Sequence, residues 1–288
     1  MIRTQRAHVH VAALSHPGMT GKNNEDRFAV LSHVLGKDDP TPSLFAVLCD
    51  GIGGHRSGEV AADLAVNHIS EAVSNSDGRD PRAILEDAIH AASNAIAHHS
   101  ASDNDHHGMG ATCACVWIVA DKLYIAFVGD SRIYFLRGGK IQQLTTDHTW
   151  VQEAVEKNLI KPEDVRGHPN VHVIRRYLGS VKLPEVDFRL KLSDSENSIQ
   201  SSKNQGAPLQ PHDVLLLCSD GLTDMVYADE IQQIILEADS LKTAAQNLVA
   251  KANERGGHDN TTVILISIPK PRPVEEKKKG WMDWLLGE

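Results

Sequence analysis

The order of strand and helix signals restricts the fold of this chain more than any other feature. Short apolar or alternating segments typical of β-strands follow one another in series, and amphipathic helical segments lie between and after these series. A parallel sheet would need a helix or a comparable crossover between successive strands. We therefore predict an α+β fold, a four-layer α-β-β-α sandwich in which two antiparallel sheets pack together and helices flank them.

Periodicity and turn residues place the individual elements. Strands are expected at residues 7–14, 27–31, 44–48, 112–119, 123–128, 133–136, 141–144, 213–218 and 262–268. Helices are expected at residues 58–73, from Asp80-Pro81 onward, and at 149–158, 228–238 and 240–254. The strands between residues 112 and 144 are joined by tight turns, which predicts an antiparallel meander. The polar, low-complexity stretch 193–210 predicts a mobile loop.

Composition narrows the class of protein. The formal net charge is −9, which argues against a nucleic-acid-binding protein, because such proteins usually carry a basic face. An excess of carboxylates suits either cation binding or an ordinary solvated surface. No apolar run approaches the roughly 20 residues of a membrane-spanning helix, and the N-terminus lacks the apolar core of a signal peptide. We expect a cytoplasmic protein without stable membrane insertion, whose four cysteines are buried thiols.

Acidic residues recur where predicted strands begin or end. They are Asn24-Glu25-Asp26, Asp50-Gly51, Asp220-Gly221 and Asp259-Asn260. Each pair alone is an ordinary turn dipeptide. Strand ends on one edge of a sandwich can converge, however, and converging carboxylates repel unless a cation or protons neutralise them. Oxygen ligands suit magnesium, manganese and calcium rather than zinc. The joint pattern therefore predicts a site for hard divalent cations.

The chain also carries a series of ordered motifs. They are NNED (23–26), DGIGGHRSGE (50–59), GDSRIY (129–134), LTTDHT (144–149), CSDGLTD (218–224) and GGHDNTT (256–262). Over residues 8–268 this series resembles the metal-dependent protein phosphatases of class 2C, in their bacterial form. The resemblance implies hydrolysis of phosphoserine and phosphothreonine in proteins by water activated by two Mn²⁺ or Mg²⁺ ions. It also implies phosphorylated proteins as partners, among them a bacterial serine/threonine kinase that the enzyme opposes, and the substrates of that kinase.

The resemblance assigns roles to individual residues. The expected catalytic residues are Asp50, Asp220 and Asp259: Asp50 bridges the two metals, and Asp220 and Asp259 complete the first. The Gly51 carbonyl ligates one metal. The remaining expected ligands are Glu25 and Asp26, which face the second metal, and Asp130, which shares a third, weaker site with Asp220. Asn260 is expected to support Asp259, and Ser131 and Arg132 to be structural.

Two positions depart from the pattern. Relatives often carry a phosphate-gripping arginine where this chain has Gly21; Lys22 can substitute but lacks the bidentate fork. Eukaryotic relatives carry a histidine, proposed as general acid, where this chain has Ile52. His55 is a candidate proton donor, with a histidine at a helix start or on the surface as the alternative.

By the same resemblance, residues 158–177 correspond to the flap, a mobile segment that lies beside the active site in this family. Its residues His168, Arg175 and Arg176 either contact a phosphopeptide or are solvated charges, and Arg176 is the flap residue that we take as a substrate contact. The segment 103–107, DNDHH, is a loop rather than a metal site by the simpler interpretation.

Three segments divide the chain. Residues 1–268 form the predicted phosphatase catalytic domain, 269–280 a proline- and charge-rich linker, and 281–288 a short amphipathic tail. Trp281, Trp284 and Leu285 share one helical face, so the tail is suited to docking on a partner, on the catalytic domain or on an anionic membrane, with a protein contact preferred. A disordered end without a role is the alternative.

Three functions compete on the sequence alone. The first is an active phosphatase for phosphoproteins. The second is a regulatory binding protein that recognises phosphorylated partners without turnover, which Gly21 favours and the full acidic set opposes. The third is a hydrolase for small phosphate esters, which depends on loops whose shape the sequence leaves open.

Overall fold

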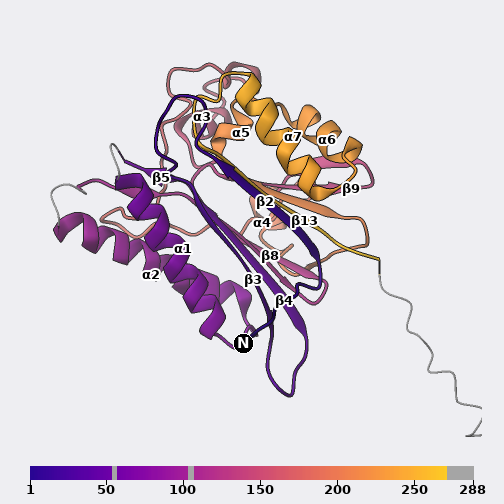
Figure 1. Cartoon of the computed structure of the whole chain (residues 1–288). Helices are drawn as coiled ribbons and strands as arrows, with labels where there is room; N and C mark the ends of the chain where they lie inside the picture. Colours follow the sequence, from indigo (N-terminus) through magenta and orange to yellow (C-terminus); the bar gives the residue numbers. More distant parts are fainter. Residues whose placement is uncertain (54–56, 103–106, 271–288) are drawn as a thin grey trace, which may run out of the picture.

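Two antiparallel sheets face each other at the centre of the molecule, and helices cover both outer faces (Figure 1). The structure is a computed structural model, and it describes residues 1–53, 57–102 and 107–270. The predicted α+β sandwich is confirmed. Among the described residues, no helix combines the length and apolar character needed to cross a bilayer.

The first sheet has six strands in the spatial order β1-β3-β4-β7-β8-β11. Their bounds are Ile2–Arg3 for β1, Arg27–Val34 for β3, Pro42–Cys49 for β4, Cys113–Val119 for β7, Lys122–Val128 for β8 and Ala207–Pro208 for β11. Strand β4 lies inside the sheet and is buried from Ser43 to Cys49, as its continuous apolar run requires. Helices α1 (Ser57–Asn75) and α2 (Pro81–Ser102) cover the outer face.

The second sheet has five strands in the order β10-β9-β12-β13-β2. Their bounds are Lys140–Gln143 for β10, Arg132–Arg137 for β9, Val214–Cys218 for β12, Thr261–Ser267 for β13 and His10–His16 for β2. Helices α6 (Ala228–Glu237) and α7 (Leu241–Glu254) pack on its outer face. Side-chain alternation explains this, because Leu216 and Leu265 point to the helices while Leu217 and Ile264 point to the other sheet.

Short elements complete the described part of the fold. Strand β5 (Gly51–Ile52) pairs with β6 (Gly110–Ala111), and the remaining helices of the described residues are α3 (Trp150–Glu156), the 3-10 turn η2 (Pro162–Asp164), α4 (Ser198–Ser201) and α5 (Asp220–Thr223). Strands β4 and β12 both end at one edge of the sandwich, where β5 and α5 begin two residues later. The edge therefore collects the acid-glycine pairs of both sheets.

The core has three apolar layers. Leu48 and Phe127 from the first sheet meet Leu217 and Ile264 from the second in the central layer. The two outer layers join each sheet to its own helices. All four cysteines are free and buried, which confirms that prediction.

The predicted meander is wrong. Strands β7 and β8 belong to the first sheet, whereas β9 and β10 belong to the second, so the chain crosses between sheets after Val128. Gly129 makes this crossing with a φ of +111°, and a Cβ there would lie 2.7 Å from Thr112 Cβ. A sharp turn that only glycine tolerates thus carries Asp130 to the junction of the two sheets.

Two other segments differ from prediction. The N-terminal strand runs over His10–His16 rather than 7–14, and a further short strand, β1, precedes it. The stretch 193–210 contains α4 and β11 instead of only a loop. Asn197 and Gln200 form a reciprocal cap at the start of α4, and Ser201 is buried, so local polar contacts organise this stretch.

Candidate metal centre

Carboxylates from both sheets converge at one edge of the sandwich. Burial and then the negative charges of Asp26, Asp220, Asp130 and Asp259 raise the pKa of Asp50 well above its usual value. Aspartates far apart in sequence therefore lie within electrostatic reach of one another. The structure brings together the carboxylates that the sequence predicts as metal ligands.

Asp26 is the most enclosed of these groups. It is 2% exposed, and one carboxylate oxygen, Oδ2, accepts a hydrogen bond of 2.8 Å from Ser219 Oγ. The other oxygen, Oδ1, is buried with no hydrogen-bond partner. Burial raises the pKa of Asp26 to about 6, against the opposing effect of hydrogen bonds from Thr262 and Ser219. A buried oxygen without a donor is what a cation or a proton would satisfy.

Glu25 and Gly51 meet where α1 begins. A Cβ on Gly58 would lie 2.6 Å from Glu25 Oε2 and 2.8 Å from the Gly51 carbonyl oxygen. A Cβ on Gly51 would lie 2.1 Å from the Gly58 carbonyl oxygen, so these two glycines pack backbone to backbone. Two oxygens, the Glu25 carboxylate from the loop before β3 and the Gly51 carbonyl from β5, therefore approach the same point.

The second acid-glycine pair shows the same close packing. A Cβ on Gly221 would lie 2.0 Å from the Asn260 carbonyl oxygen, so the segments that carry Asp220 and Asp259 are pressed together. Burial and then the charges of Asp130, Asp224, Asp259 and Asp26 raise the pKa of Asp220 well above its usual value.

Asn260 fixes the loop that carries Glu25. Its side-chain amide donates to the carbonyls of Pro17 (3.1 Å) and Asn23 (3.0 Å), and its Oδ1 accepts from the Glu25 backbone N–H at 2.7 Å. The backbone N–H of Asn260 donates to Asp259 Oδ1 at 3.0 Å. The Asn260 side chain thus joins the loop at 17–25 to the start of β13, whereas its contact with Asp259 is made by the backbone alone, so the predicted support of Asp259 stays a prediction.

Asp130 lies at the crossing between the sheets and is 7% exposed. Burial and the nearby Asp147 raise its pKa to about 7, although Arg132 opposes the shift. Arg132 contacts both oxygens of Asp147 through Nε at 3.0 Å. Ser131 Oγ lies 2.7 Å from Thr112 Oγ1, which accepts from the Asp50 backbone N–H at 2.9 Å. Ser131 and Arg132 thus make the structural contacts that were expected of them.

Sequence reasoning gave no role to two residues of the site. His172 Nδ1 lies 3.7 Å from Asp224 Oδ2 and 3.9 Å from Asp220 Oδ2. These three residues form a group that could hold a metal ion, and the flap supplies the histidine. The spacing of Asp220 and Asp224, four residues apart across a short helix, could have revealed that they share a face. No sequence signal placed His172.

The four remaining predicted positions have different outcomes. Lys22 Nζ lies 3.7 Å from Asp259 Oδ1, so it reaches the site. Gly21 has a φ of +76° and open space around it. Arg176 contacts Glu185 instead of a carboxylate of the site. His55 lies outside the described residues, as do residues 103–106 of the DNDHH segment.

The donor set fits hard divalent cations. Apart from His172, the converging groups are carboxylate and carbonyl oxygens, the ligands that Mg²⁺ and Mn²⁺ prefer. The nearby cations Lys22, Arg27, Arg132 and Arg166 are fewer than the six predicted ligand carboxylates and Asp224, and Arg132 is held by Asp147. Burial first, and then the charges of neighbouring carboxylates, raise the pKa values of Asp26, Asp50, Asp130 and Asp220.

Comparison with known proteins agrees with this geometry. The family model described as protein phosphatase 2C matches residues 16–161. The serine/threonine phosphatase stp of Listeria monocytogenes is 33% identical over 262 residues, which are 90% of this chain and 95% of that protein. The chain belongs to the protein phosphatase 2C family. This membership confirms the enzyme class and cofactors predicted from the sequence: a metal-dependent serine/threonine protein phosphatase that uses Mn²⁺ or Mg²⁺.

Solved structures of the protein phosphatase 2C family share the fold. The serine/threonine phosphatase of S. agalactiae matches with a TM-score of 0.78 at 28% identity, covering 90% of this chain and 99% of that chain. The PstP catalytic domain, solved in complex with two manganese ions, matches with a TM-score of 0.72 at 31% identity, covering 90% of this chain and 97% of that chain.

Proposed function

We propose that this chain hydrolyses phosphoserine and phosphothreonine in proteins and opposes a bacterial serine/threonine kinase in a cytoplasmic signalling pathway. The observation that carries the proposal is the convergence of carboxylates from both sheets, one of which, Asp26, has a buried oxygen, Oδ1, without a hydrogen-bond donor. Relatives named serine/threonine phosphatase support the substrate class. Reduced, buried cysteines suit the proposed reducing compartment.

The proposed metal ligands are those that the family resemblance implies. We assign Asp50 to both metals, the Gly51 carbonyl to one of them, Asp220 and Asp259 to the first metal, and Glu25 and Asp26 to the second. Asp130, with Asp220, is assigned to a third, weaker site. Asp224 and His172 are near enough to Asp220 to contribute there.

In the proposed site, the side chains of the protein hold the metal ligands in place and orient the phosphoryl group. Two divalent cations, when bound, favour ionisation of an attacking water and offset charge on the phosphoryl oxygens. Ser219 holds Asp26 through its hydroxyl, and Thr112 and Ser131 fix the backbone before Gly51. Lys22, beside Asp259, is positioned to bind a phosphoryl oxygen as a point charge. No covalent phosphoenzyme is required.

Phosphate release from a phosphothreonine peptide tests the proposal. Wild type is measured with manganese and with chelator, beside Asp220→Asn and the control Asp87→Asn, which removes an exposed carboxylate on α2. We expect manganese-dependent turnover in wild type and control, and a loss of about 100-fold or more in Asp220→Asn, since it removes a ligand of the proposed cation that ionises the water.

The competing functions give different results in the same assay. Well-folded, metal-loaded wild type that binds phosphopeptides without releasing phosphate would point to the regulatory binding protein. Turnover of small phosphate esters alone, with no hydrolysis across a panel of phosphothreonine and phosphoserine peptides, would point to the small-ester hydrolase. Either result contradicts the protein phosphatase.

A further inference from the structure

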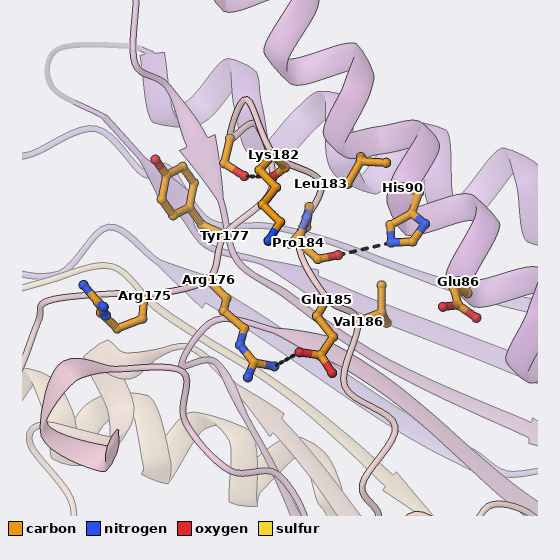
Figure 2. Close-up of a pocket in the computed structure, with 11 residues that line it drawn as sticks. Glu86, His90, Arg175, Arg176, Tyr177, Lys182, Leu183, Pro184, Glu185 and Val186 are labelled. Atoms are coloured by element: carbon orange, nitrogen blue, oxygen red, sulfur yellow. Dashed lines mark hydrogen bonds and ion pairs between the residues drawn. The ribbon is translucent and has the colours of Figure 1, made fainter. Parts of the chain in front are cut away.

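A cleft of about 550 Å³ lies between α2 and residues 175–186 (Figure 2). Its cationic side chains are Arg175, Arg176 and Lys182, and its acidic ones are Glu86 and Glu185. The whole chain has a formal net charge of −9, so the local excess of positive charge in this cleft is opposite in sign to the net charge of the protein. Such a local excess selects for anionic groups on a binding partner.

Two of the three cations of the cleft, Arg176 and Lys182, are available to a partner, because Arg175 Nε lies 3.6 Å from Glu153 Oε1. Arg176 Nη1 lies 3.4 Å from Glu185 Oε2, and the Glu185 side chain is 81% exposed (Figure 2). An exposed ion pair of this kind contributes little, so a carboxylate of a partner can replace Glu185 at small cost. Among the described residues, no ion pair engages the Lys182 ammonium, and the side chain is exposed. The cleft can therefore accept an added negative charge.

The cleft is connected to the metal centre through three adjacent backbone segments. Leu178 exchanges two backbone hydrogen bonds with Ala111, of 3.1 and 2.8 Å. Ala111 pairs in turn with Gly51, and the Thr112 N–H donates to the Asp50 carbonyl at 2.8 Å. Neighbouring segments in such pairing lie about 4.8 Å apart, so Leu178 is about 10 Å from Gly51.

The distance between Leu178 and Gly51 determines which residue of a peptide bound at the metal centre can reach the cleft. An extended peptide advances about 3.3 Å per residue, so the step of about 10 Å to Leu178 corresponds to about three residues, and the cleft, which begins at the neighbouring Tyr177, lies at this distance or beyond it. Tyr177 lines the near end of the cleft, and a Cβ on Gly110 would lie 2.7 Å from its ring, so the ring packs on this backbone. The buried residues Pro184 and Val186 offer apolar contacts to the stem of an inserted side chain.

We propose that this cleft binds an acidic side chain of the phosphoprotein substrate, three or more residues from the phosphorylated serine or threonine. The inference rests on the proposed function, since it names the class of phosphopeptide that the metal centre prefers. Lys182 and Arg176 are the groups that bind the acidic side chain, and Glu185 competes with it for Arg176.

Phosphothreonine peptides with one glutamate test the cleft. The glutamate is moved from about six residues before to about six residues after the phosphothreonine, and each peptide is compared with its glutamine counterpart. In wild type we expect kcat/KM to be about three- to tenfold higher for glutamate at one or two positions, three or more residues away on one side, and the ratio to fall toward one in high salt.

Two variants give a sharper test, because one removes a positive charge from the cleft and the other removes a negative charge. Lys182→Gln removes a cation and should bring the glutamate-to-glutamine ratio toward one. Glu185→Gln frees Arg176 and should raise the ratio. The matched control, Lys242→Gln, removes an exposed lysine on α7 and should leave the ratio unchanged.

The outcomes separate this inference from the proposed function. Manganese-dependent hydrolysis of all peptides with a ratio near one at every position would overturn the cleft and leave the phosphatase intact. A wild-type preference that neither Lys182→Gln nor Glu185→Gln moves would overturn the assignment to this cleft. Absence of hydrolysis of every peptide would instead contradict the proposed function.

Discussion

Gly21 shows how backbone conformation limits a single residue. It lies where relatives often carry an arginine, and its φ of +76° is a conformation that side chains rarely adopt. No atom lies within 4 Å of a Cβ built there, so a side chain has space although the backbone disfavours it.

Restoring arginine at this position should therefore have two separable effects. In Gly21→Arg we expect KM for a phosphothreonine peptide to fall about three- to tenfold, because guanidinium binds phosphate in a bidentate manner. The free energy of unfolding should fall by about 1 kcal/mol, because a side chain is disfavoured at positive φ. Steady-state kinetics and urea unfolding measure the two.

Gly21→Ala is the matched control for that change, because it carries the same backbone cost without the charge. It should lose the same stability and leave KM unchanged. An equal change of KM in both variants would show that loop conformation, and not phosphate binding, determines the effect.

The raised pKa of Asp130 predicts a pH dependence of stability in the metal-free protein. Its folded pKa is about 7 and its usual value 3.8, so between these values the folded state binds more protons than the unfolded state. The free energy of unfolding therefore decreases as pH rises from about 4 to about 7. Asp130→Asn cannot ionise, so above pH 7 it should exceed wild type by up to a few kcal/mol.

Urea unfolding in chelator from pH 4 to 8 checks this expectation. The advantage of Asp130→Asn over wild type should shrink toward zero as pH falls to 4. An advantage independent of pH, or a variant less stable than wild type above pH 7, would show that Asp130 is ionised at no cost in the folded protein.

At the residue scale the sequence located the acidic residues of the site better than their neighbours. Asp50 and Asp220 were predictable because a strand that stops at an acid-glycine pair fixes where the acid lies. His172 was not, because the flap that carries it has no periodic pattern, and its contact with Asp224 depends on tertiary packing. Arg176 was predicted as a substrate contact because it lies in the flap; its ion pair with Glu185 depends on tertiary packing, and its role stays a prediction.

At the scale of elements, Arg166 makes two of the contacts that attach the flap to the rest of the protein. The Arg166 guanidinium lies 3.7 Å from the centre of the Tyr227 ring, at the residue before α6, and Arg166 also donates to the Asp224 carbonyl. An exposed cation–π contact is worth about 0.5–1 kcal/mol.

Tyr227→Leu should therefore loosen the flap. We expect amide hydrogen exchange in the flap to accelerate about two- to fivefold, since 0.5–1 kcal/mol changes an opening equilibrium by that factor. The control Gln233→Ala, on the solvent side of α6, should leave flap exchange unchanged. Faster exchange in the central strands as well would indicate global destabilisation instead of a local attachment.

Elements with long apolar patterns were predicted closely, and those defined by polar contacts were not. The run at residues 44–48 and the helix that begins at Pro81 agree with β4 and α2, because burial and capping are local in sequence. Helix α4 escaped prediction since its start depends on the reciprocal cap of Asn197 and Gln200 in a polar stretch. The crossing at Gly129 was missed because tight turns look alike whether strands remain in one sheet or change sheets.

At the scale of the whole molecule, the metal centre joins the two sheets. Asp50 follows β4 in the first sheet, Asp220 follows β12 in the second, and Asp130 lies between β8 and β9. Without cations these carboxylates repel across the sheet interface; with cations the same groups are linked. The sequence was sufficient to predict the layers of the fold. It could not predict which strand ends meet across those layers, because that depends on the complete order of strands in both sheets.

Metal binding should therefore stabilise the protein as a unit. A ligand at 100 times its Kd stabilises the folded state by about 2.7 kcal/mol, which for a chain of this size corresponds to roughly 5–10 °C in Tm. We expect manganese to raise Tm by this amount relative to chelator, and to slow amide exchange in the central strands of both sheets as well as in the loops.

Asp50→Asn distinguishes this linkage from weak binding at the acidic surface. It removes the carboxylate proposed to bridge the metals and also one of the repelling charges, so its Tm in chelator should be higher than that of wild type, and manganese should raise it little. Asp87→Asn should behave as wild type in both conditions. If manganese raised Tm equally in Asp50→Asn and wild type, or protected only the loops at the edge, then the cations would bind without joining the sheets.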